Sequence, residues 1–175
     1  MFFPKQNAVL IKNTSTIKLY GKVIIKGVPL IGDTKQIKNG ISISVVYKNM
    51  KDEVIDPTKI IQGTDFKAIV TVINLSKTRN LKEMALLQLF PSGWEIHNSR
   101  MDEVAANTND ARYQDIRDDR VYSYYDAPVG TAKVFTTRLN ATYLGKFYLP
   151  AINSEAMYDN SVSASVPGFW VNVVK

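Results

Sequence analysis

The chain contains no cysteine and only one histidine, His97, among its 175 residues. The absence of cysteine excludes disulfide bonds, thiolate metal sites and cysteine nucleophiles within this chain. The common catalytic triads and zinc sites require a histidine with positioned partners, which a lone histidine supplies poorly. We therefore expect no catalytic residue, no metal site and no cofactor here, and we expect His97 to lie at the surface or rim of the fold.

Long apolar runs, targeting segments and the common catalytic motifs are also missing. No stretch approaches the about 20 apolar residues of a membrane-spanning helix, so no insertion into a membrane is expected. Residues 1–7 (MFFPKQN) lack an apolar signal core with a cleavage site. The sequence has no phosphate-binding loop, dinucleotide fingerprint or Gly-x-Ser-x-Gly motif. Its length suits one domain, or one domain with a small appendage.

Arginine is absent from residues 1–55, where nine lysines and three acidic residues give a net charge of +6. The remaining residues, 56–175, carry equal numbers of basic and acidic side chains. Lysines of the basic part are spread among strand-like residues, and phosphate recognition usually recruits arginine as well. We therefore favour a solvated or domain-facing surface over a polyanion site, and we expect no nucleic-acid partner.

In place of helical patterns, the sequence shows side chains that alternate between two faces with a period of two residues, which is typical of β-strands. Clear runs cover residues 66–73, 121–125, 134–143 and 169–174, and turn signals separate them. Further strands are expected at residues 7–11, 17–20, 22–26, 41–48, 84–90 and 146–149. Short strands with such turns predict an all-β chain folded as an antiparallel β-sandwich. The expected core residues are Phe66, Val70, Val72, Leu139, Phe147 and Val171.

Residues 101–120 break this pattern, and we expect them to form a long loop with one short helix at most. The loop would hold three carboxylates among three arginines: Asp115, Asp118 and Asp119 with Arg112, Arg117 and Arg120. A calcium site or a glycosidase carboxylate pair are the functional alternatives. We favour ion pairing, because an arginine can grip a carboxylate through two hydrogen bonds and already supplies the positive charge.

Three blocks stand in a fixed order within the second half of the chain: ALLQLFPSGWEI at residues 85–96, YQDIRDDRV at 113–121 and SEAMYD at 154–159. Together they resemble the last macroglobulin-like domain of bacterial alpha-2-macroglobulins, large cell-envelope proteins that trap proteases. The resemblance covers residues 41–175. It implies a macroglobulin-like sandwich of immunoglobulin-like architecture, with extra N-terminal strands.

The resemblance also implies how the chain is divided and what surrounds it. Residues 1–38 would be the terminal strands of a preceding β module, and residues 39–175 the C-terminal domain. The partners would be neighbouring domains of the same full-length chain and, indirectly, a target protease, in the cell envelope or periplasm. The family's thioester joins a Cys to a Gln, so without cysteine it would have to lie in another domain.

Site residues follow from the same resemblance. Pro91, Gly93 and Trp94, with Asp115, Arg117, Asp118, Asp119 and Arg120, match structural signatures of the family. Met157 and Tyr158, with Glu155, are expected at a loop that contacts the thioester domain or its equivalent. Met157 plugging its own sandwich edge is the alternative.

Two other functions remain open on the sequence alone. One is a free-standing carbohydrate- or protein-binding β-sandwich that uses an outward tyrosine face, with Tyr122 and Tyr124 as the candidates. The other is a β-sandwich glycosidase that uses two of the aspartates. A full-length reading frame would distinguish them, because a macroglobulin domain should be preceded by a very long chain.

Overall fold

The computed structural model describes residues 12–21, 35–97 and 110–175, and within these ranges every regular element is a β-strand. The strands are β1 (Ile37–Asn39), β2 (Ile41–Asn49), β3 (Lys59–Ile61), β4 (Asp65–Asn74), β5 (Leu81–Leu89), β6 (Trp94–Ile96), β7 (Tyr113–Ile116), β8 (Arg120–Ala127), β9 (Ala132–Ala141), β10 (Gly145–Leu149), β11 (Ile152–Ala156), β12 (Asp159–Val166) and β13 (Phe169–Val174). The described residues contain no helix that could cross a membrane.

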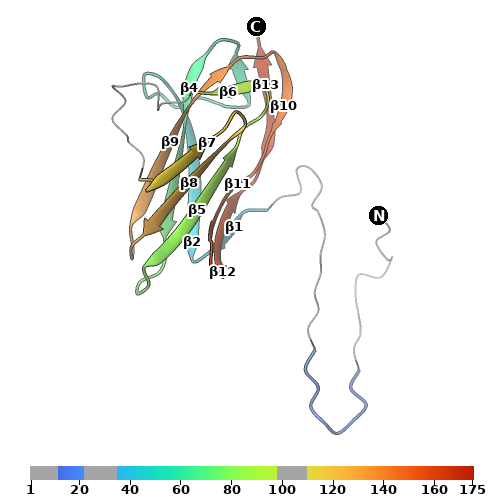
Figure 1. The fold of residues 1–175 in the computed structure, drawn as a ribbon. Coiled ribbons are helices and arrows are strands. Elements are labelled where there is room, and N and C mark those ends of the chain that lie inside the picture. Colours follow the sequence, from blue (N-terminus) through green and yellow to red (C-terminus); the bar gives the residue numbers. More distant parts are fainter. Residues whose placement is uncertain (1–11, 22–34, 98–109) are drawn as a thin grey trace.

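These strands form a β-sandwich of two layers (Figure 1). One layer is a six-stranded sheet in the order β1-β12-β11-β5-β8-β7. The facing layer is a four-stranded sheet, β2-β4-β9-β6, which a smaller sheet, β10-β13-β3, supplements. All recorded strand pairs are antiparallel except β13 with β3, which is parallel. The prediction of an all-β antiparallel sandwich is thus confirmed, with one parallel pairing that the sequence did not reveal.

A long bent hairpin links the small sheet to the six-stranded sheet. Its arms are β10–β11 and β12–β13, and they keep one register across the bend, with Leu149 opposite Phe169 and Ile152 opposite Val166. Pro150 and Pro167 lie at the bend, where a residue without an N–H interrupts the ladder at little cost. Gly168 is required there, because a Cβ at this position would lie 2.4 Å from the Leu149 carbonyl oxygen.

The core is made by the period-two runs, whose alternate side chains face inward. One cluster lies between the six- and four-stranded sheets and includes Val70 and Val72, while a second lies beneath the small sheet and includes Phe66, Leu139 and Val171. These five predicted core residues are buried. Phe147 is only half-buried, because it lies on β10, which is an edge strand that pairs with β13 alone.

The turn before β6 shows what the first block of the resemblance does structurally. The Trp94 N–H donates to the Pro91 carbonyl at 2.9 Å, and the buried Trp94 ring packs edge-on against Phe66 with centroids 4.9 Å apart. Gly93 lies directly under the Phe147 ring, which a Cβ would meet at 2.3 Å. The block therefore closes one end of the second core cluster.

Several expectations about individual segments need correction. Residues 113–116 form strand β7 rather than part of a loop, because they pair with β8. Residues 17–20 form no strand and expose their apolar side chains, since no described strand lies beside them. Tyr143, the last residue of the strand predicted at 134–143, lies beyond the end of β9 and is exposed. The strands predicted at residues 7–11 and 22–26, and residues 101–109, lie outside the described residues.

The predicted domain boundary between residues 38 and 39 remains a prediction. Strand β1 spans it, and Ile37 and Lys38 already pair with Ser165 and Ala164 of β12. Whatever precedes residue 37, the sandwich thus begins two residues before that boundary.

Candidate interdomain contact at a hairpin tip

Met157 and Tyr158 form the two-residue turn between β11 and β12, at one end of the sandwich. Their side chains are 48% and 84% exposed, respectively. The sequence placed this pair at an exposed loop tip, and the structure places it at an exposed turn. The residues just before it differ from expectation, because 154–156 continue β11 instead of forming a loop.

Strand β11 is an inner strand of the six-stranded sheet, paired with β12 on one side and β5 on the other. Ser154 and Ala156 face the core, so the alternation is present but is carried by small side chains. The Ser154 hydroxyl donates to the Ala85 carbonyl oxygen at 2.9 Å and lies 2.7 Å from the Tyr125 hydroxyl. The turn is therefore mounted on a strand that is fixed in the middle of a sheet.

A bulge in β5 holds the turn from one side. The Met157 N–H donates to the Glu83 carbonyl oxygen at 2.9 Å. Glu83 has a positive φ of 51°, and the pairing of β5 with β8 shifts register around it. Its own N–H donates to Asp126 at 3.0 Å, and Arg112 bridges Asp126 at 3.0 Å and Glu83 at 3.4 Å. These contacts offset the cost of a non-glycine residue in the left-handed region.

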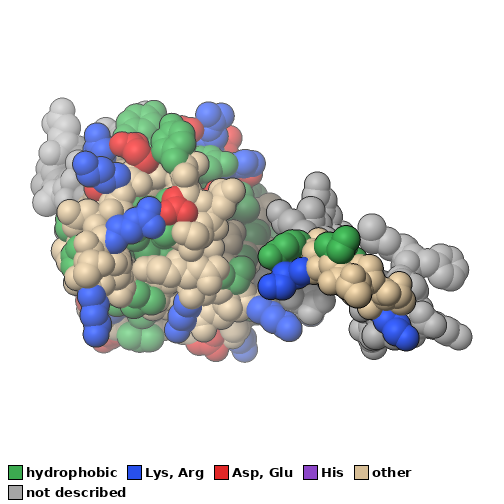
Figure 2. Space-filling view, turned by 90° about the horizontal axis from the view of Figure 1, so that it is seen from below, with side chains coloured by type: hydrophobic (Ala, Val, Ile, Leu, Met, Phe, Trp, Pro, Cys, Tyr) green, Lys and Arg blue, Asp and Glu red, His purple; other side chains and the backbone are tan. Residues whose placement is uncertain are grey.

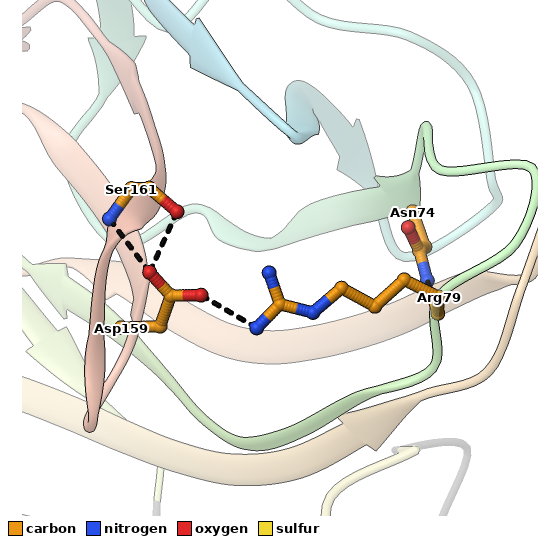
Figure 3. Close-up of polar contacts among 4 residues, drawn as sticks. All are labelled: Asn74, Arg79, Asp159 and Ser161. Atoms are coloured by element: carbon orange, nitrogen blue, oxygen red, sulfur yellow. Dashed lines mark hydrogen bonds and ion pairs between the residues drawn. The ribbon is translucent and has the colours of Figure 1, made fainter.

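Asp159 holds the turn from the other side (Figure 3). Its carboxylate accepts hydrogen bonds from the Ser161 N–H at 3.0 Å and the Ser161 hydroxyl at 2.6 Å, and it pairs with Arg79 at 2.6 Å. Arg79 belongs to the β4–β5 loop, which the buried Asn74 side chain fixes by donating to the Arg79, Ala127 and Pro128 carbonyl oxygens. The exposed tip is thus supported by polar contacts from three segments, which we call the polar frame: the β5 bulge at Glu83, the β4–β5 loop at Arg79, and the start of β12 at Asp159 and Ser161.

This frame shifts the titration of Asp159. Its pKa is lowered to about 2, first by the hydrogen bond from the Ser161 hydroxyl, then by the Ser161 N–H and by Arg79. The same group titrates near its ordinary value of about 3.9 in an unfolded chain. A carboxylate with a lowered pKa stabilises the fold above the unfolded value and loses that contribution as the pH falls through the folded value.

We predict a matching pH dependence for the Asp159→Asn variant. At neutral pH the variant should have a lower free energy of unfolding than the wild type, because it loses the charge-assisted contacts. The difference should shrink between about pH 4 and pH 2, as the wild-type carboxylate becomes protonated. Urea unfolding at several pH values measures it, with Asp118→Asn as control, since Asp118 makes no recorded bond to the described residues. A difference that is the same at pH 7 and pH 2 would contradict the assigned role.

Glu155, the third residue expected at the contact, belongs to strand β11 and not to the turn itself. It is on β11 two residues before the turn, and its exposed side chain faces the outer surface of the six-stranded sheet. There it lines a hollow of about 420 Å³ together with Tyr122 and several small side chains. The structure thus places Met157 and Tyr158 at the tip and Glu155 on the adjoining strand, and the contact of these residues with a neighbouring domain stays a prediction.

The carboxylate–arginine block forms the hairpin between β7 and β8. Arg117 pairs with Asp115 at 3.0 Å, and Arg120 grips Asp119 through two hydrogen bonds of 2.8 and 2.7 Å, which lower the pKa of that carboxyl. Arg112 instead pairs with Asp126 and Glu83. Within the described ranges no group of three or more His, Asp or Glu side chains is placed to hold a metal ion. The block is arranged as an ion-paired turn.

Other candidate residues lie on separate surfaces. His97 is exposed directly after β6. Tyr122 and Tyr124 point outward from β8, with ring centroids 6.4 Å apart, and Tyr113 stacks on Tyr124 at 6.0 Å. In the face shown in Figure 2, Lys and Arg side chains are scattered among neutral and acidic ones, so this face has no single basic patch.

Residues 40–160 match the family model of the bacterial alpha-2-macroglobulin MG10 domain. The chain belongs to this family. The match contains all three sequence blocks and the hairpin tip, with Glu83, Arg79 and Asp159 of its polar frame, and it ends one residue before Ser161. It confirms the resemblance that the blocks indicated, and it makes the chain a macroglobulin-like domain of a bacterial alpha-2-macroglobulin.

The curated relatives of this MG10 domain are much longer proteins. It is 26% identical over 139 residues to an alpha-2-macroglobulin of Pasteurella multocida, a match that covers 79% of the chain and 7% of the relative. It is 24% identical over 186 residues to an alpha-2-macroglobulin homolog of Yersinia pestis, covering 93% of the chain and 9% of the relative. The chain thus spans less than a tenth of these relatives.

Solved structures share the fold of this MG10 domain. A mutant of Salmonella alpha-2-macroglobulin superposes with a TM-score of 0.71 at 20% identity, covering 81% of this chain and 10% of that one. An Escherichia coli alpha-2-macroglobulin structure from domain MG7 to the C-terminus gives 0.70 at 13% identity, covering 80% of this chain and 24% of that one. At these identities the likeness concerns the fold alone.

Proposed function

We propose that this MG10 domain is a non-catalytic latch within a full-length alpha-2-macroglobulin. Its hairpin tip would pack on a neighbouring domain in the resting state, which is the thioester domain or its equivalent where no thioester exists. Cleavage of a bait segment by a target protease would release that contact and allow the molecule to rearrange around the protease. The cell envelope or periplasm is the proposed location, on the basis of family membership.

The observation that carries this proposal is the combination of exposure and rigidity at the tip. Met157 and Tyr158 present apolar surface to solvent, yet the turn below them is fixed by Glu83, Asp159 and Arg79. A backbone that is already held in one place loses little conformational freedom when a partner covers the turn, so apolar groups on a fixed turn suit a contact that forms repeatedly. Methionine adapts to irregular surfaces, and tyrosine adds a hydroxyl that can hydrogen bond.

The chemistry of the proposed contact suits a thioester neighbour. An apolar tip placed over a thioester would exclude water and slow its hydrolysis. Among the solved relatives is Salmonella alpha-2-macroglobulin reacted with methylamine. Attack by an amine is the reaction expected of a thioester, which supports an amine-reactive group in a neighbouring domain of the present protein as well.

The rival functions receive less support. A free-standing binding module does not fit a chain that matches under a tenth of each curated relative. A glycosidase receives little support from Asp115 and Asp119, because each is paired with an arginine and the pKa of the Asp119 carboxyl is lowered by the hydrogen bonds from Arg120, which is the wrong direction for a general acid. We therefore also propose that the domain has no enzymatic activity of its own.

Site-specific crosslinking tests the latch. We expect a photoreactive benzoylphenylalanine in place of Tyr158 of the full-length protein to crosslink within the same chain, to a domain other than MG10. The crosslink should disappear after cleavage by a protease, because the contact is released. The same probe at Tyr143, which is exposed at the opposite end of the long hairpin's arm, serves as control. Equal crosslinking from Tyr158 before and after cleavage, or none before cleavage, would refute the proposal.

A further inference from the structure

The outer face of the six-stranded sheet carries a hollow that the latch does not use. It has a volume of about 420 Å³, within the range of about 300–1,000 Å³ that is usual for small-ligand sites. Strands β1, β12, β11, β5 and β8 all contribute to it, so its shape is fixed by the hydrogen-bonded sheet. Tyr122 on β8 and Ile37 on β1 lie at the two ends of this strand order, and residues of β12, β11 and β5 line the hollow between them.

Ser165 is the polar residue that points to a ligand. It faces outward on β12, between the inward Ala164 and the half-buried Val166, yet only 7% of it is exposed because it lies at the floor of the hollow. Its hydroxyl makes no recorded hydrogen bond to any described residue. The hydroxyl is not one of the fully enclosed unsatisfied groups of the described residues, so it is open to the hollow and can donate to or accept from a ligand there.

The other polar groups of the hollow also keep free hydrogen-bonding capacity. Asn153 makes a single long contact, from its side-chain N–H to the Ala151 carbonyl oxygen at 3.4 Å, which leaves its amide oxygen free to accept. Ser163 accepts a weak hydrogen bond of 3.4 Å from Asn39 and can still donate. The Glu155 carboxylate has no recorded ion pair with the described residues and can accept from two hydroxyl groups.

The register of the sheet places these groups in two adjacent rows. Ser165, Asn153 and Leu87 lie directly across from one another, followed by Tyr122 on β8. Ser163, Glu155 and Ala85 form the row beside them. Each row thus begins with a serine hydroxyl on β12, continues with an amide or a carboxylate on β11 and an apolar side chain on β5, and ends with a tyrosine on β8.

We propose that this hollow binds a neutral oligosaccharide that carries N-acetyl groups. Sugar hydroxyls would hydrogen bond to Ser165, Asn153 and Glu155, and the apolar face of a sugar ring would lie against Tyr122. The methyl of an N-acetyl group matches the apolar strip of Ala85 and Leu87, which adjoins the Asn153 amide. Because Glu155 alone is charged among the described residues that line the hollow, phosphate, sulfate and carboxylate ligands are disfavoured.

Nuclear magnetic resonance titration of the 175-residue chain with a β-1,4-linked N-acetylglucosamine trisaccharide tests the site. We expect saturable shifts confined to backbone amides of β11, β12, β5 and β8 around the hollow. The glucose trisaccharide, which lacks the N-acetyl groups, should bind at least about fivefold more weakly, since it offers nothing to the apolar strip. Shifts that map to another surface, or no saturable shift up to about 10 mM, would overturn the proposal.

Matched variants separate the hollow from the rest of the surface. Ser165→Val removes the free hydroxyl, fills the floor and suits a strand, and should weaken binding at least about tenfold. Asn153→Ala removes an exposed side chain and should weaken binding about fivefold, which keeps the test decisive if the first variant fails to fold. Tyr143→Ala, outside the hollow, should bind as the wild type does. Unchanged binding in Asn153→Ala would refute the assignment, and none of these variants touches the hairpin tip.

Discussion

Replacing Leu139 by alanine is expected to lower the free energy of unfolding by about 2–5 kcal/mol. Leu139 lies on β9 in the second core cluster, is 1% exposed and pairs across the sheet with Phe66 on β4. Truncation loses the transfer free energy of the leucine side chain and leaves a cavity that the surrounding strands can fill only in part. Chemical denaturation of the 175-residue chain measures the change as a lower midpoint with the same slope.

Leu144→Ala is the matched control, because it removes the same atoms from a side chain that is 43% exposed in the β9–β10 loop. Its effect should stay within about 0.5 kcal/mol, as for most surface substitutions. Equal midpoints for Leu139→Ala and the wild type would show that the inward face of β9 has been assigned wrongly.

Period two was enough to predict the core faces of the long strands. Val70 and Leu139 were placed correctly because each strand alternates cleanly and because β4 and β9 each pair with a neighbouring strand along both edges. Phe147 follows the same alternation but is half-buried, since burial on an edge strand depends on what covers its open side. Alternation gives the direction of a side chain, and topology decides how deeply it is buried.

Strand β7 was missed because its sequence, Tyr-Gln-Asp-Ile, is short and polar and becomes a strand only by pairing with β8. Strand β11 was read as a loop for a related reason: its inward residues Ser154 and Ala156 are small, so the usual apolar signal is weak. In both places the neighbouring strands, and not local preference, determine the structure.

The exposed position of Met157 and Tyr158 could be predicted from the sequence, but most of the contacts that hold their turn in place could not. The Asp159–Ser161 contact is local and belongs to a known turn pattern of aspartate with a serine two residues on. The ion pair of Asp159 with Arg79, by contrast, joins residues 80 positions apart, and no pattern in either segment predicts it. The glutamate with positive φ, Glu83, likewise shows itself only in three dimensions.

The double variant Met157→Asp with Tyr158→Ala is expected to leave the isolated chain nearly unchanged and to weaken the resting state of the full-length protein. In the isolated chain both side chains are largely outside the core, so stability should change by less than about 0.5 kcal/mol. In the full-length protein, covering the exposed parts of the two side chains would stabilise the resting state by roughly 2–4 kcal/mol, which the variant loses. An aspartate buried at that contact would add a further cost.

A loss of this size corresponds to at least about a tenfold shift toward the open state. Where the full-length protein contains a thioester, the same variant should also incorporate methylamine faster, because the reactive bond is less well shielded from solvent. A Lys51→Ala change, in the turn after β2 and away from the tip, supplies a control that should leave both properties as they are.

The most direct test of the latch compares the 175-residue chain and the full-length protein, each with and without the double change at Met157 and Tyr158. Thermal unfolding is measured on the chain, and the rate of limited proteolysis on the uncleaved full-length protein. We predict an unchanged unfolding midpoint for the chain and faster proteolysis of the full-length variant. A chain that unfolds at a markedly lower temperature would make the pair ordinary core, and an unchanged rate of proteolysis would show that the tip holds no neighbour.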